Sequence, residues 1–143
     1  MAVYFHNQEI DFILPEKNKI SNWIEEVIFL ENFFIGDINL IFTGKEYLLK
    51  INQKYLSHDY HTDVITFDYN IEKIISGDIF ISVETVFENA KIYKKNKKEE
   101  MLRIIIHGIL HLLNYKDKDK KDKIIMKEKE DLYIKFFEKN LSF

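Results

Sequence analysis

Two histidines, His107 and His111, lie inside the longest apolar run of the chain. This run extends over residues 104–113, and an apolar segment of this kind after a charged stretch favours a buried helix, which we expect over 99–113. Residues four apart lie on the same face of a helix, so the two imidazoles point the same way. Because burying two polar rings without partners is costly, the pair indicates a shared ligand.

Asp117 is the candidate third member of this group. Asn114 stands where the helix should end, and Asn is the second choice after Gly for the left-handed residue that stops a helix. The chain then turns back and can bring Asp117 toward the histidines. Zinc accepts imidazole nitrogen and carboxylate oxygen, and a hydrolytic zinc site has three protein ligands and one open position. We therefore expect one zinc ion on His107, His111 and Asp117.

The residue after the first histidine argues against a peptidase. In the H-E-x-x-H motif of zinc peptidases, that position holds the glutamate that acts as general base. Here it is Gly108. The spacing of the metal ligands is retained but the base is missing, so a zinc peptidase or other amide hydrolase stays only as an alternative function.

The segment with the two histidines is one of five short sequence motifs that occur in a recognisable order. They are Asn52-Gln-Lys-Tyr55, Thr62-Asp-Val-Ile-Thr-Phe67, Gly77-Asp-Ile79, His107-Gly-Ile-Leu-His-Leu-Leu-Asn-Tyr-Lys-Asp117 and Met126-Lys-Glu-Lys-Glu130. This set resembles the N-x-x-Y, T-D-V-L-S-F, G-D-I, H-G-x-L-H-L-x-G-Y-D-H and Met-x-x-x-Glu blocks of the YbeY endoribonuclease family of rRNA maturation factors. The resemblance spans at least residues 52–130.

The resemblance implies both an activity and a setting for it. It implies one domain over residues 1–143 that acts as a zinc-dependent, single-strand-specific endoribonuclease in 16S rRNA 3′-end maturation and ribosome quality control. The implied partners are single-stranded RNA, rRNA and the small ribosomal subunit. It also implies that Glu130, on the closing helix, is buried beside the metal ligands.

Three departures from the family pattern affect the site. Asp117 stands where the family usually has His, and Asn114 replaces its turn Gly. Leu56 replaces an Arg that is thought to help hold or cleave RNA, and Lys54 and Lys116 are candidate replacements for that cation. The missing Arg keeps a second alternative open, in which the chain is a non-catalytic ribosome-assembly factor with a structural metal.

Other polar residues offer weaker candidates. Asp63 follows Thr62 at the start of a predicted strand, where a carboxylate either caps the turn or orients a ligand or substrate near the metal. His58 and His61 flank Asp59 in a polar loop, and we expect them to be exposed rather than to bind the metal.

Lysines form two runs, at 94–98 and at 116–123. Such runs usually form a solvated surface, but the second begins at the metal turn and can neutralise phosphates near a cleavage point. The formal net charge of −3 argues against nucleic-acid binding by bulk charge alone.

Composition excludes several classes of protein. A chain of 143 residues suits one domain, and the lack of cysteine excludes disulfides and thiolate zinc sites. No apolar run reaches the roughly 20 residues of a membrane helix, and residues 1–10 lack the features of a secretory signal. We therefore expect a cytoplasmic protein without a membrane partner.

The hydrophobic pattern predicts alternating strands and helices. We expect strands at 2–5, 37–43, 64–69 and 78–82, a mobile connector at 70–76, and helices at about 15–28, 45–56, 83–94, 99–113 and 119–139. The last helix should place Ile125, Leu132 and Phe136 on one apolar face. The expected fold class is α+β: a small mixed β-sheet packed against helices, with the metal site on a central buried helix and the turn after it.

Overall fold

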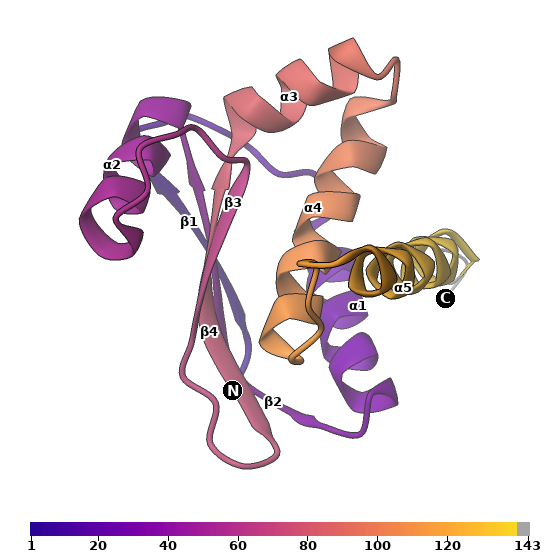
Figure 1. Ribbon diagram of the computed structural model, residues 1–143. Coiled ribbons are helices and arrows are strands. Elements are labelled where there is room, and N and C mark those ends of the chain that lie inside the picture. The colour runs from indigo at the N-terminus through magenta and orange to yellow at the C-terminus, as the bar shows by residue number, and fades with distance from the viewer. Residues whose placement is uncertain (140–143) are drawn as a thin grey trace.

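The computed structural model describes residues 1–139 and contains a sheet with helices packed around it (Figure 1). The elements, in chain order, are β1 (Val3–Gln8), α1 (Lys17–Leu30), β2 (Phe34–Thr43), α2 (Lys45–Leu56), β3 (Val64–Asp68), β4 (Ile74–Ser82), α3 (Val83–Ile92), α4 (Lys97–Leu112) and α5 (Lys120–Lys139). Within these residues, no helix is long and apolar enough to cross a membrane.

The sheet is mixed, as predicted. Its strand order is β1-β2-β4-β3, in which β2 runs parallel to β1 and to β4, while β3 pairs antiparallel with β4. The antiparallel pair places Val64 opposite Ile81, so β3 starts next to the end of β4. This arrangement confirms the expected α+β class.

Helix α4 lies at the centre of the molecule. Helices α1, α4 and α5 lie on one side of the sheet and α2 on the other (Figure 1). Helix α4 contacts β3, β4, α1, α3 and α5, and its buried apolar side chains join the main core. The helix that carries both histidines is therefore held on several sides, which suits a site that must keep its geometry.

Both ends of α4 are fixed by asparagines. The side chain of Asn96 accepts hydrogen bonds from the backbone N–H groups of Lys98 at 2.8 Å and Glu99 at 3.2 Å, so the helix begins at Lys97. At the other end, Asn114 has a φ of 73°, in the left-handed region. This confirms the predicted stop at Asn114, which turns the chain back toward the histidines.

Gly108 lets α4 pack closely on the sheet. A Cβ atom at this position would lie 2.8 Å from Cγ2 of Ile79 on β4, closer than packed carbon atoms approach. Position 108 therefore faces the sheet and supplies no side chain to the site. This geometry agrees with the expectation that the peptidase glutamate has no equivalent here.

The predicted apolar face of α5 is wrong. Ile125 and Leu132 are 37% and 53% exposed, and Phe136 is only half-buried. The buried residues are Met126, Glu130, Tyr133, Ile134 and Phe137. Apolar residues occur on both sides of this helix, and the face that is buried contains the charged residue Glu130. The hydrophobic pattern alone therefore selected the wrong face.

The predicted connector at 70–76 is also wrong in its second half. Strand β4 begins at Ile74 rather than residue 78. Before it, the Asn70 side chain donates to the Leu112 carbonyl at 2.8 Å and accepts from the Ser76 N–H at 2.9 Å. Asn70 thus links the β3–β4 turn to the end of α4. The polar sequence of this segment had suggested a mobile connector and did not indicate these contacts of Asn70.

Candidate metal centre

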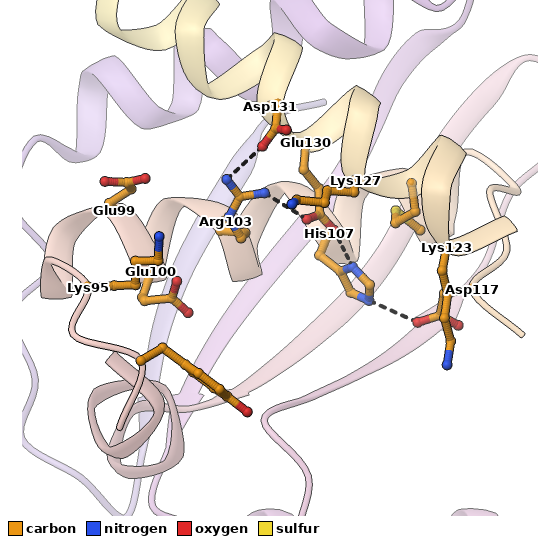
Figure 2. A pocket seen from close by; sticks show the side chains of 12 residues that line it. Lys95, Glu99, Glu100, Arg103, His107, Asp117, Lys123, Lys127, Glu130 and Asp131 are labelled. Atoms are coloured by element: carbon orange, nitrogen blue, oxygen red, sulfur yellow. Dashed lines mark hydrogen bonds and ion pairs between the residues drawn. The ribbon is translucent and has the colours of Figure 1, made fainter. Parts of the chain in front are cut away.

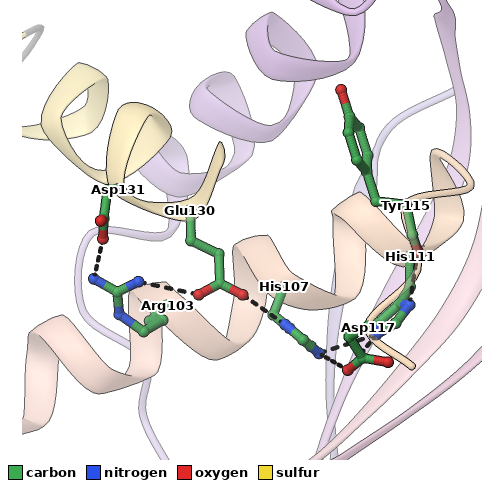
Figure 3. A network of polar contacts seen from close by, with 7 residues as sticks. All are labelled: Arg103, His107, His111, Tyr115, Asp117, Glu130 and Asp131. Atoms are coloured by element: carbon green, nitrogen blue, oxygen red, sulfur yellow. Dashed lines mark hydrogen bonds and ion pairs between the residues drawn. The ribbon is translucent and has the colours of Figure 1, made fainter. Parts of the chain in front are cut away.

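His107, His111 and Asp117 converge on one point between α4 and the turn after it (Figure 3). The Nε2 atoms of the two imidazoles are 3.0 Å apart. Oδ2 of Asp117 lies 3.3 Å from Nε2 of His107 and 3.4 Å from Nε2 of His111. These three atoms belong to a group whose possible ligand atoms all lie within 4.8 Å of one another, and such a group could hold a metal ion.

A network of charged side chains holds His107 through its Nδ1 atom, on the side of the ring away from the other two members of the triad. Its Nδ1 lies 2.6 Å from Oε2 of Glu130, and the other oxygen of that carboxylate accepts from Arg103 at 3.0 Å. Arg103 also donates to Asp131 at 2.8 Å (Figure 3). The carboxylate of a buried glutamate is thus paired on both sides, which limits the cost of burying its charge.

A second network holds His111 and the turn. Nδ1 of His111 lies 3.1 Å from the backbone carbonyl of Tyr115. The Tyr115 hydroxyl donates to Glu31 at the end of α1, at 2.5 Å. Glu31 also accepts from the Tyr133 hydroxyl and from Lys129 on α5. The turn after α4 is therefore attached to two other helices.

These supports determine which nitrogen atoms face the site. A carbonyl can only accept, so Nδ1 of His111 carries its proton and Nε2 keeps a lone pair. The Glu130 carboxylate likewise accepts from Nδ1 of His107 and leaves its Nε2 toward the site. When both rings are neutral, two nitrogen lone pairs and the Asp117 carboxylate face one another, an arrangement that a cation stabilises. The donor set of two imidazoles and one carboxylate fits zinc.

The pKa values of the two imidazoles move in opposite directions. Burial opposes the charge on His107, but the hydrogen bond and the charge of Glu130 outweigh it, so the pKa of His107 is raised. Burial and the neighbouring His107 lower the pKa of His111. His111 therefore stays neutral at physiological pH and keeps a lone pair free for a ligand.

The triad opens into two cavities. The first, of about 300 Å³, lies toward β3 and is lined by Asp63 and by residues of α2 and the following loop, together with all three members of the triad. The second, of about 720 Å³, lies between α4 and α5 and includes His107 and Asp117 at one end (Figure 2). A substrate can therefore approach the triad from either side.

Comparison with known proteins identifies the family. The model of the family described as Endoribonuclease YbeY matches residues 4–138. The chain belongs to the YbeY family. An Endoribonuclease YbeY from Flavobacterium psychrophilum is 50% identical over 131 residues, which cover 92% of this chain and 94% of that protein. One from Karelsulcia muelleri is 46% identical over 139 residues and covers 97% of both chains.

A solved structure shares the fold of this YbeY-family chain. The solution structure of a Thermotoga maritima protein aligns with a TM-score of 0.67 at 25% identity, over 94% of this chain and 88% of that one. Its similarity extends the agreement in sequence to the arrangement of the sheet and the helices. The predicted resemblance to the YbeY family is thus confirmed.

The other predicted residues have different positions. Glu130 is buried against His107, as the YbeY resemblance implied, and Asp63 lines the smaller cavity. Burial raises the pKa of Asp63, although the nearby His107 partly opposes this shift. Lys116 is exposed in the turn, and it is not among the described residues that line either cavity. Lys54 has its ammonium 5.2 Å from the centre of the Tyr55 ring.

The loop histidines make contacts of their own. His61 lies 3.8 Å from Glu46 on α2, and His58 stacks on Tyr60. In the part of the chain that the structure describes, neither belongs to the group that could hold a metal. Leu56, in place of the family's usual Arg, lines the smaller cavity and is 39% exposed.

Apart from Glu130, sequence reasoning missed the residues that support the triad. Arg103 is one helical turn before His107, so its spacing on the same face offered a signal. Glu31 offered none, because it lies 84 residues before Tyr115 in the chain and meets it only in the fold. Lys127 on α5, which lines the larger cavity beside Lys123, lies outside both predicted lysine runs.

Proposed function

We propose that this chain is a zinc-dependent endoribonuclease that cleaves single-stranded RNA, with His107, His111 and Asp117 as the ligands of one zinc ion. The observation that carries the proposal is the convergence of two imidazole nitrogens and a carboxylate oxygen at the junction of two cavities. Relatives named Endoribonuclease YbeY, at 50% and 46% identity, support the activity.

The metal and the side chains have separate roles in this proposal. A bound zinc ion would lower the pKa of a water molecule and polarise a phosphoryl oxygen. Asp63 lies in the same cavity as the triad, and burial raises its pKa, which favours a carboxyl group that can take up and release a proton. Attack by water and attack by the RNA 2′-hydroxyl are both compatible with this arrangement.

Cations around the larger cavity suit an RNA backbone. Lys95, Lys123 and Lys127 line it (Figure 2). Ammonium groups in such positions neutralise phosphates and determine where the strand lies. The carboxylates of Glu99 and Glu100 line the same cavity, and those of Glu130 and Asp131 are paired with Arg103. The lysines therefore offer local contacts to RNA phosphates, although the chain has a net charge of −3.

The family suggests where the activity is used. We infer that the chain acts in 16S rRNA 3′-end maturation and in ribosome quality control, in the cytoplasm, with the small ribosomal subunit as partner. This inference rests on the family resemblance, and it predicts that small subunits from cells without this protein carry an unprocessed 16S rRNA 3′ end.

The alternatives fit the site less well. Structural zinc sites are closed by four protein ligands, whereas the described residues offer three, beside open cavities. That difference favours catalysis over a purely structural metal in an assembly factor. An amide hydrolase would need a base that position 108 does not supply, since a side chain there would collide with Ile79.

Single-turnover cleavage of a labelled RNA tests the proposal. Zinc-loaded wild type should cleave a single strand faster than the matched duplex and should not hydrolyse a peptide of comparable length. His111→Ala, with its zinc content measured, should lose the cleavage. Undiminished cleavage by His111→Ala would contradict the proposal. If zinc-loaded wild type does not cleave RNA but binds small subunits, the assembly-factor function is favoured instead.

A further inference from the structure

Two aromatic rings stack on each other at the edge of the smaller cavity. The ring centres of His58 and Tyr60 are 5.2 Å apart, and their planes meet at 22°. The Tyr60 hydroxyl also lies 3.2 Å from Nδ1 of His58. Both side chains are exposed, and Tyr60 is 56% exposed, so packing into the core does not explain their arrangement.

The loop that carries this pair is fixed to α2. Asn52, which is buried, donates its side-chain N–H to the Tyr60 carbonyl at 2.9 Å. The backbone carbonyl of Asn52 accepts from the N–H of His58 at 3.2 Å. Gln53 donates to Asp59 at 2.6 Å. Exposed rings on a fixed backbone lose little conformational entropy when a ligand binds, which favours affinity.

The pair lies beside the candidate metal centre. His58 and Tyr60 line the cavity of about 300 Å³ that also contains His107, His111 and Asp117. This volume is at the lower end of the roughly 300–1,000 Å³ found for small-molecule sites. A ligand that reaches the triad through this cavity therefore passes the stacked rings.

We propose that His58 and Tyr60 form a stacking surface for one base of an RNA strand whose phosphate reaches the triad. The proposal rests on the proposed function and adds to it a base-binding subsite. An aromatic face stacks on any base, so the surface is tolerant of sequence. Only an unpaired base can present its face in this way, so the surface selects single strands over duplex.

Binding of a short RNA that contains the fluorescent base 2-aminopurine tests this surface. Zinc-loaded wild type, Tyr60→Ala and Tyr60→Phe are compared, and the fluorescence is read before the RNA is cleaved. Tyr69→Ala is the control, because Tyr69 is 57% exposed and also has a bonded hydroxyl, to Asp78, but does not line the cavity. The zinc affinity of each variant is measured separately.

Tyr60→Ala should weaken RNA binding about tenfold and abolish the quenching of 2-aminopurine, as the loss of one base–aromatic stack does. Tyr60→Phe should bind within about twofold of wild type, because it keeps the ring. Zinc affinity should not change in either variant. If Tyr60→Ala binds and quenches like wild type, or if Tyr69→Ala weakens binding equally, the proposal is overturned.

The outcomes also separate this proposal from the proposed function. Tyr60-dependent quenching without cleavage by zinc-loaded wild type would support the stacking surface and contradict the nuclease. Cleavage by wild type that Tyr60→Ala retains in full at low RNA concentration would support the nuclease and overturn the stacking surface. A wild type that neither binds nor cleaves RNA would overturn both.

Discussion

Oε2 of Glu130 lies 2.6 Å from Nδ1 of His107 and joins α5 to the helix that carries the candidate metal ligands. Glu130 is only 7% exposed, and its charge is met by Arg103 on the other side. A carboxylate in this position selects the tautomer of the imidazole and makes its remaining nitrogen a better donor to a metal. The buried charge on α5 thus acts on the site through His107.

Glu130→Gln should therefore weaken zinc binding by about 10–100-fold, since it removes the charge that holds His107. Isothermal titration with zinc measures the effect, and the melting temperature shows whether the fold is intact. Glu128→Gln, an exposed position on the same helix, is the matched control and should bind zinc like wild type. A Glu130→Gln variant that is folded and has wild-type affinity would show that this contact does not support the site.

Substitution of Asp117 tests the member of the triad that differs from the usual His of the YbeY family. Asp117→Ala removes one of three protein ligands and should weaken zinc binding more than Glu130→Gln does. Asp117→His supplies an imidazole, which zinc also accepts, and should keep both the fold and tight binding. The same titration decides the matter, and equal affinity of wild type and Asp117→Ala would remove Asp117 from the ligand set.

Glu31 links the stability of the protein to pH. Burial alone would raise its pKa, but hydrogen bonds from Tyr115, Tyr133 and Lys129 outweigh burial and lower it. A carboxyl group with a lowered pKa stabilises the folded state at pH values above its unfolded pKa of about 4.5, and this contribution is lost as pH falls through the folded pKa.

Glu31→Gln should therefore lower the free energy of unfolding by about 1.5–3 kcal/mol at pH 7. The difference from wild type should shrink as the pH falls below 4.5. Urea denaturation across this pH range measures both effects. Glu26→Gln, at an exposed position of α1, should show neither. A constant difference at every pH would mean that the charge of Glu31 is not what stabilises the turn.

Leu56 offers a test of RNA contact within the smaller cavity. It lines the same cavity as the triad, so Leu56→Arg places a cation near a bound phosphate and should tighten RNA binding and raise cleavage. The log–log salt dependence of binding should become steeper by about one unit. Lys116→Ala should have a smaller effect, because Lys116 is exposed and is not among the described residues that line the cavities.

Salt-dependent binding and single-turnover cleavage, measured on both variants, distinguish the two positions. If Leu56→Arg changes neither quantity while Lys116→Ala reduces cleavage, the working cation is the lysine of the turn rather than a residue of the cavity.

Features of the site that depend on residues close together in the sequence could be predicted, whereas contacts between residues far apart in the sequence could not. The i,i+4 spacing of the histidines and the stop at Asn114 are local, so the sequence alone indicated both the shared helix face and the turn toward Asp117. The contact between Glu31 and Tyr115 joins residues 84 apart and had no local signal. The face of α5 was assigned wrongly because its buried stripe contains Glu130, whose charge is compensated only in the folded protein.

The central claim is that these three groups hold one ion and that RNA cleavage depends on it. Metal-stripped protein is titrated with zinc while single-turnover cleavage of a single-stranded RNA is followed in the same samples, for wild type and Asp117→Ala. The account predicts that wild-type cleavage rises with added zinc and saturates at one equivalent, and that Asp117→Ala needs far more zinc to reach any activity. Cleavage by wild type that is independent of zinc, or an identical titration for both proteins, would contradict it.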